Sequence, residues 1–288
     1  MGIAVLSLYL IELRRPQLDA WPAVISSIGA PVGIAAGALT GGVISDVLGF
    51  SGQWIYVVVN VLLAGCLVGL LRSPKTTPRQ RGLLASLRPV LAAPTSMGWL
   101  CAALSTAMVA AWSVGSLYQS LGSAMVATYL DHNGSLFAGV VVGMVIGLTT
   151  VGGPSFARVS PTTATFCSLL TITVGMIGMV LGLHLHDEPV FLVFSAVSGV
   201  GFGGATTGIL RTVMAEVPSD EIGRFLTIVY LAGFVGSAFP AAIAAILDSH
   251  VGIRVALVGH ASFVVAFAIV SSALLARVQM ESSTTARG

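Results

Sequence analysis

The sequence has very few charged residues. Asp, Glu, Lys and Arg make up 8% of its 288 residues, against about 25% in an ordinary soluble domain. Hydrophobic residues account for 56% of the chain, and the mean hydropathy is +0.97. The net charge of +2 gives no indication of a nucleic-acid partner. This composition favours a membrane protein whose main partner is the lipid bilayer.

Cysteine is also scarce. The three cysteines, Cys66, Cys101 and Cys167, all lie in apolar stretches, which predicts small buried side chains and neither a disulfide framework nor a zinc site. The polar segment 184–188 contains two histidines and two acids, but no second group of ligands lies nearby in the sequence, so we interpret it as a polar loop. We therefore expect no metal and no cofactor.

Long apolar runs make up most of the sequence. A helix needs about 20 apolar residues to cross the hydrocarbon core of a bilayer. Eight segments meet this requirement, and the run from Gly2 to Ile11 is too short to do so. The sequence predicts an all-α polytopic membrane protein with eight full transmembrane helices and an N-terminal half-helix. The eight predicted spans are 21–45, 54–71, 97–119, 134–156, 164–184, 190–211, 225–247 and 255–276.

The positive charges alternate between the connecting segments. Twelve of the thirteen Lys and Arg residues fall in one set of connections, and the other set contains only Arg254. Cytoplasmic loops of membrane proteins carry an excess of Lys and Arg. This pattern predicts a multi-pass protein of the plasma membrane, with the basic segment 73–96 and the C-terminal tail in the cytoplasm.

Several motifs resemble those of a known family. The segment 33–42, Gly-Ile-Ala-Ala-Gly-Ala-Leu-Thr-Gly-Gly, resembles the G-x-x-x-G-P-x-x-G-G motif in the fifth helix of drug exporters of the major facilitator superfamily, with Ala38 in place of the proline. The segment 46–56 resembles the turn into their sixth helix. The segment 216–224 resembles the charged turn between their tenth and eleventh helices. Six spans after a basic linker also match the family's second half.

The resemblance covers essentially the whole chain and implies its organisation. Residues 1–72 would be a remnant of the N-terminal half (the end of helix 4, then helices 5 and 6), so that the chain is truncated at its N-terminus. Residues 73–96 would be a cytoplasmic linker, 97–276 the C-terminal six-helix half, and 277–288 a cytoplasmic tail. The implied function is secondary active transport of an unknown small molecule, by efflux, with protons as a candidate coupling ion. A non-transporting fragment is the alternative.

A membrane-embedded enzyme is a further alternative. It would need a catalytic constellation near the middle of the membrane, such as a cluster of His and Asp residues, and the sequence contains none. We therefore expect no enzymatic activity.

Two glycine series occur at helical spacing. Gly29, Gly33, Gly37 and Gly41 are four residues apart, with Gly42 adjacent, and Gly139, Gly143 and Gly147 form a second series. Small residues at this spacing let helix backbones approach closely in membranes. We predict that the Gly33–Gly37–Gly41 face contacts the second series, as helices five and eight would in the family fold. Generic small-residue packing is the alternative for each series.

Charged residues near the span ends suggest a second contact. Arg158, Glu216 and Arg224 lie in the turns that the family resemblance places in the cytoplasm, and we predict that they form a salt-bridge latch there. Exposed ion pairs contribute little free energy, so the alternative is a set of solvated loop residues.

No Asp, Glu, Lys or Arg lies near the middle of a predicted span, although such residues commonly form ion sites in transporters. Either the coupling acid lies upstream or transport is uncoupled. His260 is interpreted as a hydrogen-bonded packing residue rather than a proton relay, and Tyr118 as an aromatic residue at the membrane interface. Polar and aromatic side chains in the spans are the candidates for a substrate cavity: Asn60, Trp112, Ser116, Gln119 and Tyr230.

Overall fold

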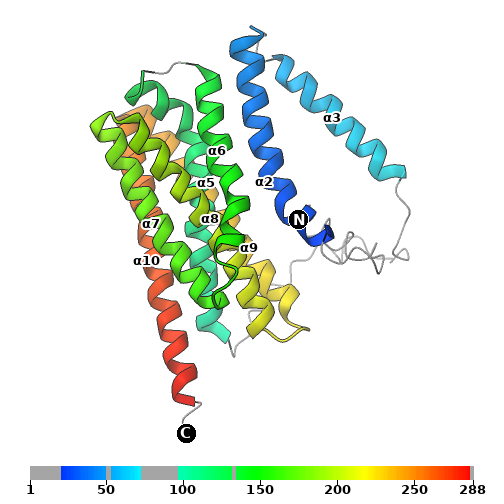
Figure 1. Cartoon of the computed structure of the whole chain (residues 1–288), viewed down its shortest axis with the longest axis vertical. Helices are drawn as coiled ribbons and strands as arrows, with labels where there is room; N and C mark the ends of the chain where they lie inside the picture. The colour runs from blue at the N-terminus through cyan, green and yellow to red at the C-terminus, as the bar shows by residue number, and fades with distance from the viewer. Residues whose placement is uncertain (1–20, 50–52, 73–96, 132–133, 286–288) are drawn as a thin grey trace.

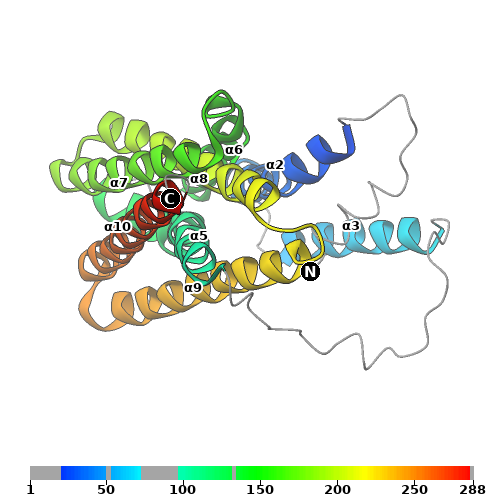
Figure 2. The ribbon, with the colours of Figure 1, turned by 90° about the horizontal axis from the view of Figure 1, so that it is seen from below.

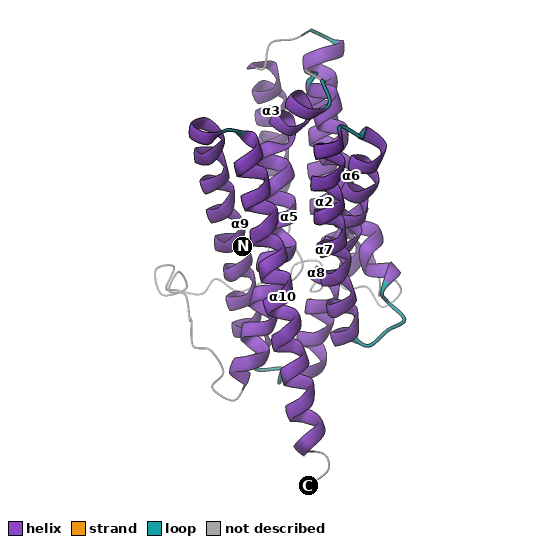
Figure 3. Cartoon of the chain, turned by 90° about the vertical axis from the view of Figure 1, so that its left-hand side faces the viewer, coloured by secondary structure: helices purple, strands orange, loops and turns teal. Residues whose placement is uncertain are grey.

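The computed structural model describes residues 21–49, 53–72, 97–131 and 134–285. These residues form helices and short connections and contain no strand (Figure 3). Seven of the helices are long and apolar enough to cross a membrane, and α3 adds a shorter apolar helix. The all-α, polytopic fold is therefore confirmed. The predicted half-helix before residue 21 lies outside the described residues.

The helices follow one another in antiparallel order (Figure 1). In chain order they are α2 (Trp21–Gly42), the π-helical turn η1 (Val43–Val47), α3 (Gln53–Arg72), α5 (Gly98–Tyr129), α6 (Ser135–Ser155), α7 (Pro161–Leu185), α8 (Glu188–Glu216), α9 (Ile222–Val251) and α10 (Ile253–Thr285). Helices α5 to α10 pack into one bundle, α2 lies along α6, and α3 stands apart (Figures 1 and 2).

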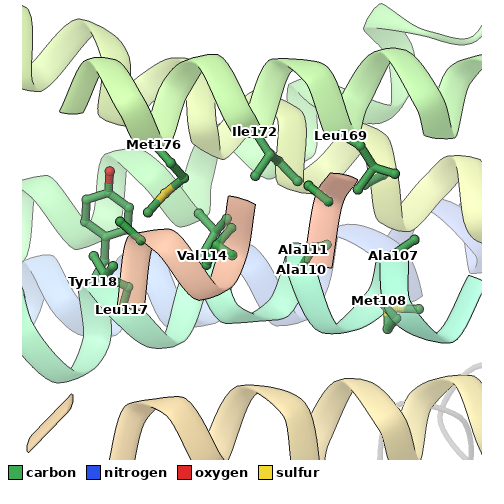
Figure 4. Packing of buried hydrophobic residues seen from close by; sticks show 14 of the residues in the cluster. Ala107, Met108, Ala110, Ala111, Val114, Leu117, Tyr118, Leu169, Ile172 and Met176 are labelled. Atoms are coloured by element: carbon green, nitrogen blue, oxygen red, sulfur yellow. The ribbon is translucent and has the colours of Figure 1, made fainter. Parts of the chain in front are cut away.

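Helix α5 is the centre of the bundle. It contacts α9, α10, α8, α6 and α7, and most of its membrane span is buried. Leu169, Ile172 and Met176 of α7 face the α5 side chains that include Val114 and Tyr118, and all of these are fully buried (Figure 4). The apolar core of the molecule thus lies around α5.

Helix α5 ends ten residues after the span predicted at 97–119, at Tyr129 instead of residue 119. The predicted span ended at Tyr118 and Gln119, but neither residue interrupts the helix. The Tyr118 hydroxyl lies 3.4 Å from the Ser198 hydroxyl, and the Gln119 side chain bonds to a carbonyl of its own helix. The interpretation of Tyr118 as an interfacial residue is wrong, because its side chain is completely buried.

Polar bonds join α5 to α9 and α10. His260 of α10 bonds through Nε2 to the Ser113 carbonyl at 3.0 Å, and Ser271 donates to the Ala103 carbonyl at 2.8 Å. Ser113 donates in turn to the Gly236 carbonyl of α9 at 3.1 Å. Lipid removes most of the hydrophobic drive between helices, so such bonds help to hold them together. The prediction that His260 is a hydrogen-bonded packing residue is confirmed.

Helix α8 packs through glycine on two sides. A Cβ on Gly199 or Gly203 would collide with the α6 backbone at Val145 or Thr149. On the other side, a Cβ on Gly208 would lie 2.6 Å from the Thr165 hydroxyl of α7. Helix α8 therefore lies between α6 and α7 with backbone nearly touching backbone.

Helix α3 has no buried side chain among its described residues, and its exposed residues are almost all apolar. Cys66 is exposed on this helix, so the prediction of a buried cysteine holds for Cys101 but is wrong for Cys66. In a membrane, this surface would face lipid or other transmembrane helices.

Candidate functional site

The strongest candidate site lies between α5 and α9. Trp112, Ser116 and Gln119 occupy positions i, i+4 and i+7 of α5, so they share one face of that helix. The Trp112 ring packs edge-on against two α9 rings, with centroids 4.5 Å from Phe234 and 6.0 Å from Tyr230. The structure thus places Tyr230 against Trp112, and Ser116 and the exposed Gln119 follow Trp112 along the same face of α5.

The polar atoms of this face are held mainly by α5 itself. Ser116 donates to the Ser113 carbonyl at 3.1 Å, and Gln119 donates through Nε2 to the Gly115 carbonyl at 3.1 Å. The Trp112 indole Nε1 differs, because it is buried and has no hydrogen-bond partner among the described residues. A buried donor without an acceptor is unfavourable, and a bound molecule with an acceptor atom could satisfy it.

Two further aromatic residues border this face and were not predicted. Phe234 lies one helical turn after Tyr230, and this i, i+4 spacing of aromatic residues was a signal in the sequence. Phe202 of α8 approaches Gly115, where an added Cβ would lie 3.1 Å from Phe202 Cε1. Gly115 thus leaves room for an aromatic ring between α5 and α8. The face is mostly aromatic with a few neutral polar groups, which is the composition of many small-molecule sites.

Asn60 lies elsewhere, on the exposed surface of α3. Its side chain donates to the Tyr56 carbonyl at 2.7 Å, within its own helix. The structure shows no bond or ring contact between Asn60 and the other four candidates. A pocket at the start of α3 is lined by Ile44, Leu48, Trp54 and Val58, all apolar.

The predicted contact between the two glycine-containing helices, α2 and α6, is correct, but the predicted contact face of α2 is wrong. Helix α2 does pack on the Gly139–Gly143–Gly147 face of α6: a Cβ on Gly139 would lie 2.5 Å from the Ala38 carbonyl oxygen. However, a Cβ on Gly29, Gly33, Gly37 or Gly41 would meet no atom within 4 Å. The contacting face of α2 instead contains Ala35, Ala38, Leu39 and Gly42.

The predicted latch residues do not meet. Arg158, Glu216 and Arg224 are all exposed, and within the described residues no ion pair joins them. The bridging side chain at this end is Arg211 of α8, whose guanidinium donates to the Phe156 carbonyl at 3.2 Å and the Val159 carbonyl at 3.0 Å. Arg211 thus caps the C-terminal end of α6, where a positive charge is favourable.

The polar turn between α7 and α8 has structural roles. Asp187 accepts a hydrogen bond from the Val190 amide at 3.0 Å and so caps α8. His186 bonds through Nδ1 to the Tyr129 carbonyl at 2.8 Å, which ties the turn to the end of α5. Within the described residues, no group of three or more His, Cys, Asp or Glu side chains could hold a metal ion.

Comparison with known families agrees with this architecture. The sequence profile of the Major Facilitator Superfamily matches residues 23–239, which is more than half of the chain. The chain belongs to the major facilitator superfamily. The match covers α2, α3 and α5 to α8 and reaches into α9, where Tyr230 and Phe234 lie. No curated protein sequence matches the chain. Members of this superfamily are membrane transporters rather than enzymes.

Proposed function

We propose that the protein is a secondary permease that exports a small, mainly apolar molecule across the plasma membrane. Family membership supports transport in general. The observation that carries the finer proposal is the α5 face of Trp112, Ser116 and Gln119, where the α9 rings of Tyr230 and Phe234 pack against Trp112.

The chemistry of this face suggests the substrate class. Aromatic rings bind apolar bodies and attract cations through their faces, and the free indole N–H of Trp112 can donate to an acceptor on the ligand. We therefore propose a lipophilic molecule that is neutral or singly positive and carries at least one hydrogen-bond acceptor. The assignment of Asn60 to the substrate cavity stays a prediction, because the structure shows no bond or ring contact between Asn60 and the residues of this site.

The proposed organisation follows the division predicted from the sequence. Residues 1–72 would belong to one half of the transporter and 97–276 to the other, joined by the basic segment 73–96 on the cytoplasmic side. The two parts would move against each other around a central site, as alternating access requires. The described helices carry no acidic residue near mid-membrane, so proton coupling would need a group outside them.

A dye-efflux measurement tests this function. Cells that express the full chain should accumulate less ethidium than cells with an empty vector, and collapse of the pH gradient should abolish the difference if protons drive export. Trp112→Ala should reduce the export rate by about tenfold or more, because a central aromatic contact of this kind is worth roughly 2 kcal/mol or more. Trp99→Ala is the control, since Trp99 is half-exposed at the Arg277 end of the bundle.

Equal accumulation with and without the correctly inserted protein, across ethidium and other lipophilic cations, would contradict export of this substrate class. Export that is unchanged by Trp112→Ala would instead move the site away from the α5–α9 face.

A further inference from the structure

Helix α6 begins without a cap of its own. Gly134 is its N-cap residue and offers no side chain, and its first turn contains no acidic residue. The free amide groups of the first turn of a helix need acceptors, and a negative charge is favoured there. Among the described residues, the acceptor comes from ninety positions earlier in the chain.

That acceptor is Asp46. Its Oδ2 accepts a hydrogen bond from the Leu136 amide at 2.7 Å, and the neighbouring Ser45 hydroxyl lies 3.4 Å from the Ser135 hydroxyl. Asp46 lies in the π-helical turn η1 that ends the α2 segment. Single π-helical turns within helices often occur at functional positions. Here the turn presents a carboxylate to the N-terminus of α6.

The contact between α2 and α6 is not uniform along its length. It is tightest near Asp46, where an added Cβ would lie 2.7 Å from Leu136 Cα for Gly42 and 2.5 Å from the Ala38 oxygen for Gly139. A Cβ added to Gly143 would lie 3.1 Å from its nearest neighbouring atom, and one added to Gly147 would lie 3.8 Å from its nearest neighbour. The two helices are therefore closed at the Asp46 end and diverge toward the other end.

From these observations we propose that Asp46 is a gating residue, which holds the Asp46 end of the α2–α6 contact shut and must leave the α6 N-terminus when this end opens. The proposal rests on the proposed transport function, because it assigns the bond to one of the two states of alternating access. The bond suits such a role because it is strong and short-ranged. A charge-assisted hydrogen bond keeps its strength only with direct contact, so a small separation of the helices releases it completely.

Two cysteine pairs measure the two parts of the contact separately. Ser45→Cys with Ser135→Cys reports on the Asp46 end. Ala35→Cys with Gly147→Cys reports on the diverging part, where the added Cβ of Gly147 lies 3.8 Å from that of Ala35, the mean Cβ separation in disulfides. The background is the full chain in membranes with Cys66, Cys101 and Cys167 replaced by alanine. A protease site is inserted in segment 73–96. After cleavage, the fragment with α2 and the fragment with α6 run separately on a gel unless a disulfide joins them.

Asp46→Ala should slow oxidative cross-linking of the 45/135 pair by about tenfold while leaving that of the 35/147 pair unchanged or faster. Asp46→Asn should have a smaller effect, because its amide oxygen can still accept the Leu136 bond but carries no charge. Asp131→Asn is the control, since Asp131 is an exposed carboxylate at the same end of the bundle and its replacement should change neither rate.

An unchanged 45/135 rate in Asp46→Ala would overturn the proposal. An equal loss in both pairs would also overturn it, because Asp46 would then hold the whole of α2 rather than one end. Cross-linking needs no substrate, so a failure of the efflux measurement leaves this result interpretable on its own.

Discussion

Gly139→Leu should separate α2 from α6, whereas Gly37→Leu should not. The two glycines belong to two series with the same spacing in the sequence, but their surroundings differ. A Cβ on Gly139 would lie 2.5 Å from the Ala38 carbonyl oxygen and 3.2 Å from the Ala38 carbonyl carbon, which are backbone atoms that cannot rotate away. A Cβ on Gly37 would meet no atom within 4 Å.

The size of the effect follows from this geometry. An ordinary contact of a Cβ begins near 3.4 Å, so even alanine at position 139 would require a shift of about 1 Å. A gap of that size forfeits a quarter to a half of each dispersion contact along the interface. Overpacking of this kind costs about 1–3 kcal/mol, which corresponds to a fall of roughly 5- to 150-fold in the docking equilibrium of α2.

The assay is cross-linking of the 35/147 cysteine pair in the cysteine-free background. Gly139→Leu should slow the reaction markedly, and Gly37→Leu should leave it within about twofold of the parent. Size-exclusion chromatography in detergent checks that both variants remain folded. Equal slowing by the two substitutions, or slowing by Gly37→Leu alone, would refute the assignment of the α2 contact face.

Three further predictions concern the bundle and its orientation. Gly203→Leu should abolish monodisperse protein, because its side chain would enter the Thr149 backbone of α6, whereas Gly65→Leu on exposed α3 should be tolerated. Arg211→Ala should lower the melting temperature, because it removes two charged hydrogen bonds, each worth about 1.5–3 kcal/mol before relaxation. Arg158→Ala removes only an exposed charge and should leave the melting temperature unchanged. A cysteine at Thr77 should resist an impermeant thiol reagent in intact cells and react after permeabilisation; labelling in intact cells would reverse the predicted orientation.

The sequence predicted the approximate positions of the described helices because hydrophobic length is a direct requirement of the bilayer. Seven of the eight predicted spans are long and apolar enough to cross a membrane, and α3 is shorter. It also predicted the pairing of α2 with α6 through the family motif. It did not predict which face of α2 makes the contact. In a soluble helix the buried face is distinguished by its apolar side chains, but α2 is apolar all round. An apolar helix face can pack equally well against lipid or against protein. The glycine spacing therefore did not decide which face of α2 contacts α6.

The candidate site was predicted only in part, for a related reason. Trp112, Ser116 and Gln119 share one face by spacing alone, but the contact of Trp112 with Tyr230 depends on how α5 and α9 cross. The span was predicted to end at Tyr118 and Gln119, because the sequence does not show that the Tyr118 hydroxyl lies beside a hydroxyl on α8. The close packing of α8 was not predicted, although Gly199 and Gly203, and also Gly204 and Gly208, have the same spacing of four as the two series predicted to pack.

Helix α6 shows how such distant contacts could be anticipated. Its first turn contains no acid, its last turn no base, and neither end has a side-chain cap of its own. An uncapped helix end leaves backbone groups without partners, so each end of α6 requires a group from elsewhere. The structure supplies opposite charges that match the helix dipole: Asp46 at the N-terminus and Arg211 at the C-terminus. The Arg211 bond lies within the bundle of α5 to α10, whereas the Asp46 bond joins that bundle to the α2 segment. Of the two caps, only the Asp46 bond can therefore break without disturbing the bundle itself, which is the property that a gate between two moving parts requires.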